Sequence, residues 1–135
     1  MTSLKQGIRN LIIADATYLT LMGSPTADHK NTFYMQPPVS PVYPETVFWI
    51  EAPLFNGEMD RDLLSIMGAL NINVWAKDNT YESITDRLRI LLHQKPVISK
   101  ARIVLASMPQ ELYDQTLDAY GLNTVFNIYY RRALQ

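Results

Sequence analysis

The sequence predicts an α+β domain, in which a mixed, mainly antiparallel β-sheet of four to five strands packs with an N-terminal helix and one central amphipathic helix. Two observations carry this prediction: apolar residues recur at helical spacing in two separate segments, and they alternate with a period of two in others. The segments follow the order helix, strands, helix, strands, which is typical of helices packed on a sheet. The chain has 135 residues, 47% of them hydrophobic, which is enough to form a core without disulfides.

The first 22 residues predict a helix with a break. Ser3 can cap its start, and four apolar residues then recur along one face: Leu4, Ile8, Leu11 and Ile12. Asp15 is expected to cap a second short helical turn. The run Gly23-Ser24-Pro25 ends this region, because glycine and proline both interrupt helices.

The segment 31–44 carries no charge and is interrupted by four prolines: Pro37, Pro38, Pro41 and Pro44. Phe33 and Tyr34 begin a short strand that the prolines stop, because proline cannot donate a hydrogen bond within a sheet. We predict a proline-rich extended arm at about 36–45 that can lie across another surface. The alternative interpretation is a rigid surface loop that packs on its own domain.

Two strands are predicted next. Residues 46–52 include four consecutive apolar side chains, as expected for a strand covered on both faces. After the Asn56-Gly57 turn signal and a charged loop at about 56–62, residues 63–76 lack charge, and their second half alternates strictly to form the long central strand. Trp75 lies on the face opposite Leu70, Ile72 and Val74, so it either packs under a second layer or contributes to an interface.

A second helix is predicted over about 81–94, capped by residues 78–80. Its apolar stripe consists of Tyr81, Ile84, Leu88, Leu91 and Leu92. Pro96 closes the helical region, and strands are expected over 100–107 and 118–132. Residues 109–116 fit either a short strand or a loop.

Charge and composition exclude several classes of protein. The chain has twelve Lys and Arg and thirteen Asp and Glu residues, which gives a formal net charge of −1. There is therefore no global electrostatic attraction to nucleic acid. The absence of cysteine excludes thiolate catalysis and Cys-ligated metal centres. Strictly apolar runs are far shorter than the roughly 20 residues of a membrane helix, and no convincing signal peptide is present. We therefore expect a soluble protein made in the cytoplasm.

The side chains available for catalysis or metal binding are few. His29 falls in a polar loop and His93 near the end of a helix, and both positions have structural explanations. Glu58, Asp60 and Asp62 alternate as metal-binding oxygens can, but the calcium-loop pattern is absent, and such a segment is usually a solvated loop. We expect no catalytic residue, cofactor or metal, although a small-ligand-binding or enzymatic domain that uses His93 or the acidic loop is the rival hypothesis.

The order of segments resembles the tail terminator, or tail completion, proteins of tailed bacteriophages. The resemblance covers most of the chain and rests on four segments: Leu11-Ile12-Ile13-Ala14 followed by Asp15, the strand ending Asn73-Val74-Trp75-Ala76, the helix that follows it, and Glu111-Leu112-Tyr113-Asp114 before the last strand. Order and length together carry it, because each segment alone is a packing pattern. The Asn71 and Asn73 pair and the uncharged proline arm depart from the family pattern.

The resemblance implies a structural virion protein that forms a ring, commonly of six subunits, at the head-proximal end of the tail tube. Such a ring ends tube polymerisation and contacts the major tail tube protein on one side and the head-completion or connector protein on the other. Double-stranded DNA passes through its lumen without specific binding. A head-completion or neck adaptor protein, which also forms rings, is the alternative within the same class.

Two groups of residues are assigned roles on this interpretation. The uncharged arm and the far face of the long strand are the candidates for the interface between subunits: Pro37, Pro38, Val39, Pro41, Tyr43 and Trp75. The acidic residues Glu58, Asp60 and Asp62 are expected to face the lumen, where negative charge would keep DNA from adhering.

Overall fold

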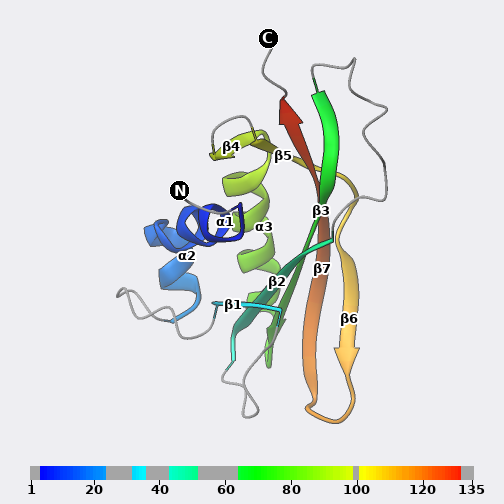
Figure 1. Cartoon of the computed structure of the whole chain (residues 1–135). Helices are drawn as coiled ribbons and strands as arrows, with labels where there is room; N and C mark the ends of the chain where they lie inside the picture. Colours follow the sequence, from blue (N-terminus) through cyan, green and yellow to red (C-terminus); the bar gives the residue numbers. More distant parts are fainter. Residues whose placement is uncertain (1–3, 24–31, 36–42, 52–63, 99–100, 132–135) are drawn as a thin grey trace.

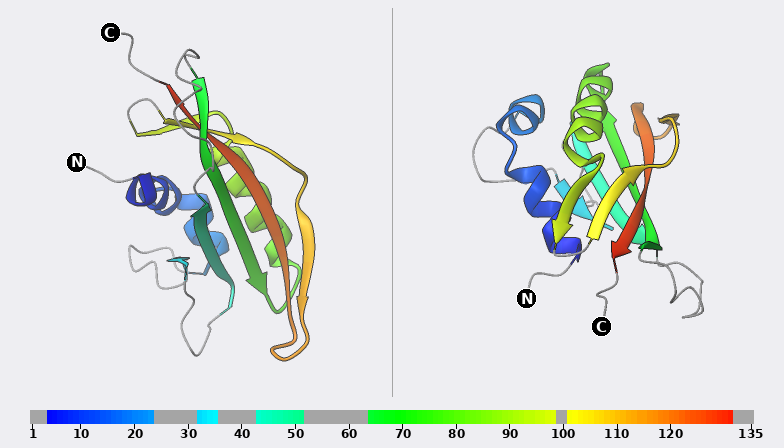
Figure 2. Two further views of the ribbon diagram at one scale, coloured as in Figure 1. Left: turned by 45° about the vertical axis from the view of Figure 1, so that its right-hand side comes forward. Right: turned by 90° about the horizontal axis from the view of Figure 1, so that it is seen from above.

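Three helices lie on one face of a seven-stranded sheet (Figures 1 and 2). The structure is a computed structural model that describes residues 4–23, 32–35, 43–51, 64–98 and 101–131. The helices are α1 (Leu4–Ile13), α2 (Ala16–Leu21) and α3 (Thr80–Leu92). The strands are β1 (Thr32–Tyr34), β2 (Glu45–Glu51), β3 (Leu64–Ala76), β4 (Lys95–Ile98), β5 (Ala101–Leu105), β6 (Gln110–Asp114) and β7 (Ala119–Arg131).

The strand order is β1-β2-β3-β7-β5-β4, and every pairing except the parallel pair β1–β2 is antiparallel. β6 also pairs with β7, along residues 119–123, whereas β5 pairs along residues 126–130 of the same strand. β5 and β6 therefore lie end to end along one edge of β7. The predicted α+β class and the mainly antiparallel sheet are confirmed.

The sheet contains more strands than the four to five expected, because β4 and β6 add to them, whereas the short strand expected at Phe33 and Tyr34 is β1. Pro96, taken as the close of the helical region, lies within β4, at the edge of the sheet, where a missing N–H costs no hydrogen bond to a further strand. The segment that fitted either a strand or a loop is the strand β6.

The predicted break in the N-terminal helical region is confirmed and lies at Asp15. Its carboxylate accepts a hydrogen bond from the Tyr18 N–H at 2.8 Å and so caps α2. Gly23 follows α2 with a φ of 73°, a conformation that glycine adopts without strain. Ser3, the predicted cap of α1, lies outside the described residues.

Residues 78–80 cap α3, as predicted. Asn79 is its N-cap but makes no side-chain capping bond. Instead, the Asp78 carboxylate accepts from the Thr80 N–H at 3.0 Å and from the Thr80 hydroxyl. The helix ends at Leu92, two residues before the predicted end.

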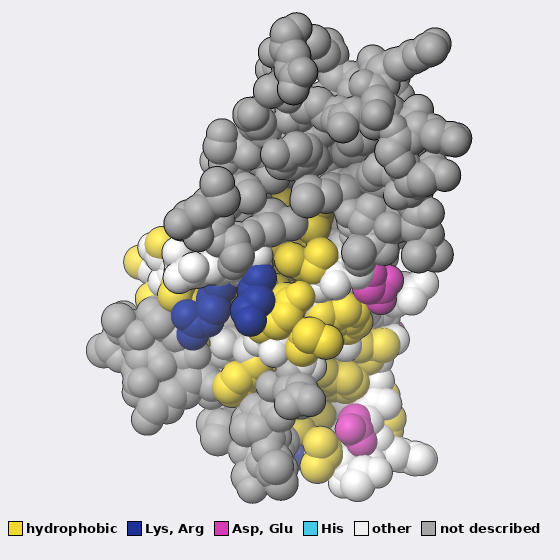
Figure 3. Space-filling model, in the orientation of Figure 1, with side chains coloured by type: hydrophobic (Ala, Val, Ile, Leu, Met, Phe, Trp, Pro, Cys, Tyr) yellow, Lys and Arg dark blue, Asp and Glu magenta, His cyan; other side chains and the backbone are white. Residues whose placement is uncertain are grey.

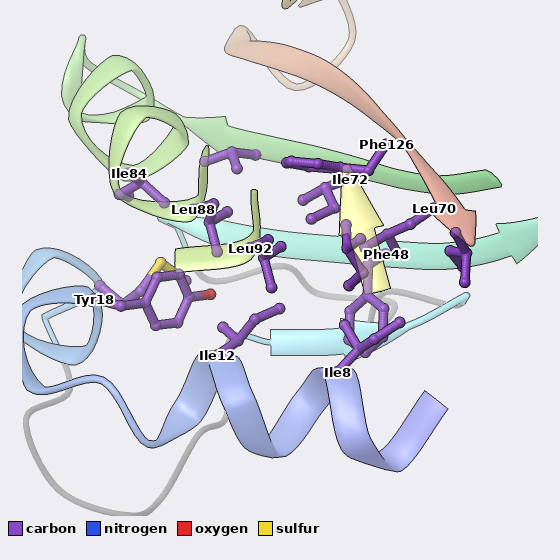
Figure 4. Packing of buried hydrophobic residues seen from close by; sticks show 14 residues of the cluster. Ile8, Ile12, Tyr18, Phe48, Leu70, Ile72, Ile84, Leu88, Leu92 and Phe126 are labelled. Carbon is purple, nitrogen blue, oxygen red and sulfur yellow. The ribbon is translucent and has the colours of Figure 1, made fainter. Parts of the chain in front are cut away.

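The core lies between the helices and the concave face of the sheet (Figure 4). α1 contributes Ile8 and Ile12, and α3 contributes Ile84, Leu88 and Leu92, all of them buried. α1 contacts both β1 and β4, strands that lie at opposite edges of the sheet. The sheet therefore curves around the helices and leaves a convex outer face. No helix among the described residues is long and apolar enough to cross a membrane.

Candidate assembly interface

The convex face of the sheet carries uncharged side chains along its centre, and the helices leave it uncovered (Figure 2). On the central strands β3 and β7, alternate residues point to the core, as Leu70, Ile72, Phe126 and Ile128 do, and the residues between them point outward. The half-buried outward residues of β2, β3 and β7 are Trp49, Asn71, Asn73, Trp75, Asn123, Val125, Asn127 and Tyr129. Glu51 lies on this face at the end of β2, where it accepts from the Trp49 indole, but β3 and β7 present aromatic and amide side chains without charge, which suits protein contact.

β3 and β7 are linked by a side-chain hydrogen bond across this face. Asn73 lies opposite Asn123 in the pairing of β3 with β7, and the Asn123 amide nitrogen donates to the Asn73 amide oxygen at 2.6 Å. Asn73 thus has a structural role. It supplies a polar pair that holds the register of the two longest strands.

Trp75 packs on the outer face against a glycine. Its register partner is Gly121, and a Cβ atom placed on Gly121 would lie 2.6 Å from the Val74 carbonyl oxygen and 2.9 Å from the Trp75 ring. The indole therefore occupies the space that the missing side chain leaves. The sequence left two interpretations of Trp75, packing under a second layer or contributing to an interface. None of the described helices provides a second layer above it, and it lies half-buried at the surface.

Tyr43 lies near Trp75 at the same end of the sheet. Glu45, two residues after Tyr43, is the register partner of Trp75 in the pairing of β2 with β3. The ammonium of Lys77, two residues after Trp75, lies 5.1 Å from the centre of the Tyr43 ring. Lys77 also donates to the Leu117 and Asp118 carbonyls in the turn between β6 and β7. Burial raises the pKa of the Tyr43 phenol, and the carboxylates of Glu45 and Asp114 add to the effect.

Glu45 is a buried carboxyl group that sequence reasoning missed. Its side chain is 3% exposed, and its Oε2 atom has no hydrogen-bond partner in the described parts of the chain. Burial raises its pKa, because the charged form loses hydration. The only signal in the sequence was its place between the prolines and an apolar strand, which does not distinguish a buried glutamate from an exposed one.

Seven of the other predicted site residues lie outside the described residues: Pro37, Pro38, Val39, Pro41, Glu58, Asp60 and Asp62. His29 lies outside them as well. The structure thus places Tyr43 and Trp75, one from each of the two predicted interface segments, at the same end of the sheet.

His93 lies directly after α3 and has a structural contact. Its Nδ1 atom accepts a hydrogen bond from the Leu105 N–H at 3.0 Å, so the end of α3 is tied to the end of β5. The ring nitrogen that accepts must be unprotonated, which places the proton of a neutral ring on Nε2. The imidazole borders an open surface pocket together with Asp86, Arg89, Ile90 and Leu105. Within the ranges that the structure describes, no three His, Asp or Glu side chains are grouped to hold a metal ion.

The likeness of this chain to known proteins lies in its fold. No family model and no curated protein sequence matches the chain. Among solved structures, a chain of the virion of a native gene transfer agent particle aligns with a TM-score of 0.63 at 16% sequence identity. The alignment covers 93% of this chain and 92% of that chain. The two chains share a fold.

Proposed function

We propose that this protein is a structural virion protein, a tail terminator that assembles into a ring at the head-proximal end of a phage tail tube. The observation that carries the proposal is the likeness of its fold, over 93% of the chain, to a chain from a virion particle. The family resemblance of the sequence adds a specific role to that likeness. The proposal places the protein in the tail or neck of the virion after assembly in the host cytoplasm.

The ring is expected to have about six subunits, related by closed cyclic symmetry. In such a ring each subunit presents two different surfaces to its two neighbours. The convex face with Tyr43 and Trp75, extended by the arm with Pro37, Pro38, Val39 and Pro41, is proposed as one of these surfaces. Its uncharged centre supports this assignment, because charged groups are depleted at the cores of interfaces.

The ring would contact the major tail tube protein on one side and the head-completion or connector protein on the other. Double-stranded DNA would pass through the lumen. Glu58, Asp60 and Asp62 are proposed to face that lumen, where like charge weakens adhesion of the phosphate backbone. No reactive group is needed for any of these roles.

The test is the phenotype of particles whose genome carries a stop codon in this gene. Electron microscopy of the lysate should show overlong tails together with unattached filled heads, and a plasmid copy of the gene should restore normal particles. Particles of normal length with heads attached would contradict the proposal.

The same images separate the alternative within the class. Loss of a head-completion or neck adaptor protein would leave tails of normal length, because the tube would still be terminated, while the heads would fail to join. That outcome would assign the chain to the neck instead of the tail end.

A further inference from the structure

The turn between β6 and β7 carries exposed hydrophobic side chains at one end of the molecule. Tyr113, Leu117 and Tyr120 are 52%, 42% and 44% exposed, and the two tyrosine rings lie 5.0 Å apart. We call these three residues, with Glu111 and Asp118, the hairpin patch. Exposed tyrosines are frequent anchors of protein interfaces, since they bury a large area with few rotatable bonds.

The hairpin patch is held in place before any partner binds. The Asp114 carboxylate accepts from the Thr116 and Leu117 N–H groups at 2.9 and 3.2 Å, which closes the turn. The Tyr113 hydroxyl donates to the Asp118 carboxylate at 2.9 Å. A preordered surface loses less conformational entropy on association, which favours a role in binding.

The same end of the molecule is acidic. Besides Glu111, Asp114 and Asp118, the loop before α3 and its first turn contribute Asp78 and Glu82, both exposed. Lys77 is the cation nearest to the turn among the described residues, and its ammonium is engaged by the turn carbonyls and the Tyr43 ring. The hairpin patch therefore combines apolar rings with unbalanced negative charge.

A surface of opposite character lies on α1 and β1. Lys5 and Arg9 are one helical turn apart, and α1 contains no acidic residue. The Lys5 ammonium lies 4.6 Å from the centre of the Tyr34 ring, and Met35 beside it is 62% exposed. We call Lys5, Arg9, Tyr34 and Met35 the α1 patch. In Figure 3, Lys and Arg side chains gather beside hydrophobic ones on the face that carries α1, away from the Asp and Glu side chains.

We propose that the hairpin patch of one copy binds the α1 patch of a second copy. The two patches are complementary in charge, and both combine that charge with exposed apolar side chains. β6 and α1 lie on opposite sides of the molecule (Figure 1), so one copy cannot satisfy its own patches. A contact between two different surfaces repeats from copy to copy, and it closes into a ring where the rotation between neighbours divides a full turn. This inference rests on the proposed function and supplies its second subunit surface.

The absence of cysteine from the chain allows a direct test by disulfide trapping. The double variant Leu117→Cys with Met35→Cys, purified as the full chain and oxidised at high concentration, should give a ladder of covalent oligomers on a non-reducing gel. Each single variant should remain a monomer. A mixture of the two single variants should stop at dimers, because each chain then carries only one reactive surface.

The matched control places the second cysteine on a surface outside both patches. Ile90 on α3 is 65% exposed, so Leu117→Cys with Ile90→Cys tests random collision at equal accessibility. A ladder no stronger than this control would overturn the inference. Dimers from Leu117→Cys alone would also overturn it, because the hairpin patch would then bind itself.

Charge reversal supplies a second readout in the trapping background. Glu111→Lys or Lys5→Glu alone should reduce the oligomer yield several-fold, and a chain that carries both reversals should recover it. Circular dichroism checks that each variant is folded. Failure of the ladder while the stop-codon particles still show overlong tails would reject the patches and leave the proposed function intact. Ladder formation with normal tails would reject the proposed function and leave the patches intact.

Discussion

Asp15 joins two parts of the helical layer that lie 72 residues apart in the sequence. Its carboxylate caps α2 and also receives two hydrogen bonds from Arg87 on α3, at 2.7 and 2.8 Å. The guanidinium holds the pKa of the Asp15 carboxyl below its usual value, and the bond from Tyr18 contributes to the same effect. A two-pronged ion pair of this kind fixes the angle between the helices.

Asp15→Asn should therefore lower the free energy of unfolding by about 1–2 kcal/mol at neutral pH. The amide still caps α2, so the loss reports the ion pair. Because the folded pKa of Asp15 lies below its unfolded value near 4, this stabilisation is present above about pH 4 and is lost as the pH falls through the folded pKa. Urea unfolding of both proteins at neutral and acidic pH should show the difference shrink in acid.

Asp86→Asn is the matched control, because the Asp86–Arg89 pair is exposed and 3.4 Å long. Its effect should stay below about 0.5 kcal/mol, as for most surface ion pairs. Equal losses from the two variants at neutral pH would contradict the role assigned to Asp15.

The contribution of Glu45 to the free energy of unfolding should depend on pH in the opposite sense. Burial raises its pKa, so its contribution to stability is favourable below the unfolded pKa and is lost as the pH rises through the folded pKa. Glu45→Gln should accordingly raise the free energy of unfolding at neutral pH by about 1 kcal/mol, and the gain should vanish near pH 4. Thermal unfolding across that pH range measures it.

Glu51→Gln, at the exposed end of the same strand, provides the control. The glutamine keeps an oxygen that can accept from the Trp49 indole, as Glu51 does at 3.2 Å. We expect its stability at neutral pH to stay within about 0.5 kcal/mol of that of the unmodified protein. A destabilised Glu45→Gln protein at neutral pH would show that the carboxylate is satisfied in the folded state.

At the scale of elements, the pairing of β3 with β7 depends on a residue without a side chain. Gly121→Ala would place a Cβ atom against the Val74 carbonyl and the Trp75 ring, and the backbone contact cannot relax as a flexible side chain could. We expect a loss of about 2 kcal/mol in unfolding free energy and a changed near-ultraviolet signal from the displaced indole.

Gly23→Asn is the control for that variant. Gly23 has a positive φ but open space around its Cβ position, and asparagine tolerates this conformation. Its cost should stay below about 1 kcal/mol. A Gly121→Ala protein as stable as the Gly23→Asn protein would contradict the close packing of Trp75.

The elements themselves differed in how well the sequence predicted them. The two long strands and α3 emerged from periodicity, because each buries a continuous apolar stripe such as Ile84, Leu88 and Leu92. β1 is expected from the aromatic pair Phe33 and Tyr34. β4 is only four residues long, too short to show a period, and its proline predicts the close of the helical region. It forms because β5 offers it hydrogen bonds, and sequence spacing does not contain that information.

At the scale of the whole molecule, the curvature of the sheet gives this protein two unlike sides. The side where β6 lies presents the hairpin patch, and the opposite side, where α1 lies, presents the α1 patch (Figure 1). The net charge of −1 conceals this division, because it sums opposite charges that lie far apart. A subunit with two unlike sides suits head-to-tail assembly.

This interpretation predicts that the histidines are dispensable. His29→Ala with His93→Ala should leave particle infectivity nearly unchanged, with a stability cost of about 1 kcal/mol from the lost bond to the Leu105 N–H. A large loss of infectivity from the histidine variant with the fold intact would favour the enzymatic alternative.

Trp75→Asp, which places a charge on the convex face, should abolish infectivity while the purified chain stays folded.

Helix caps and apolar periods are local properties of the chain, so the fold class, the position of the long elements and the break at Asp15 could be predicted from the sequence. Which distant residues meet followed from the fold alone: Glu45 beside Trp75, Asp15 with Arg87, and Tyr113 against Tyr120. Strand register and sheet curvature depend on contacts between distant segments, which no local pattern records. The near-balance of charge belongs to the sequence, whereas its separation into an acidic hairpin and a basic helix belongs to the fold.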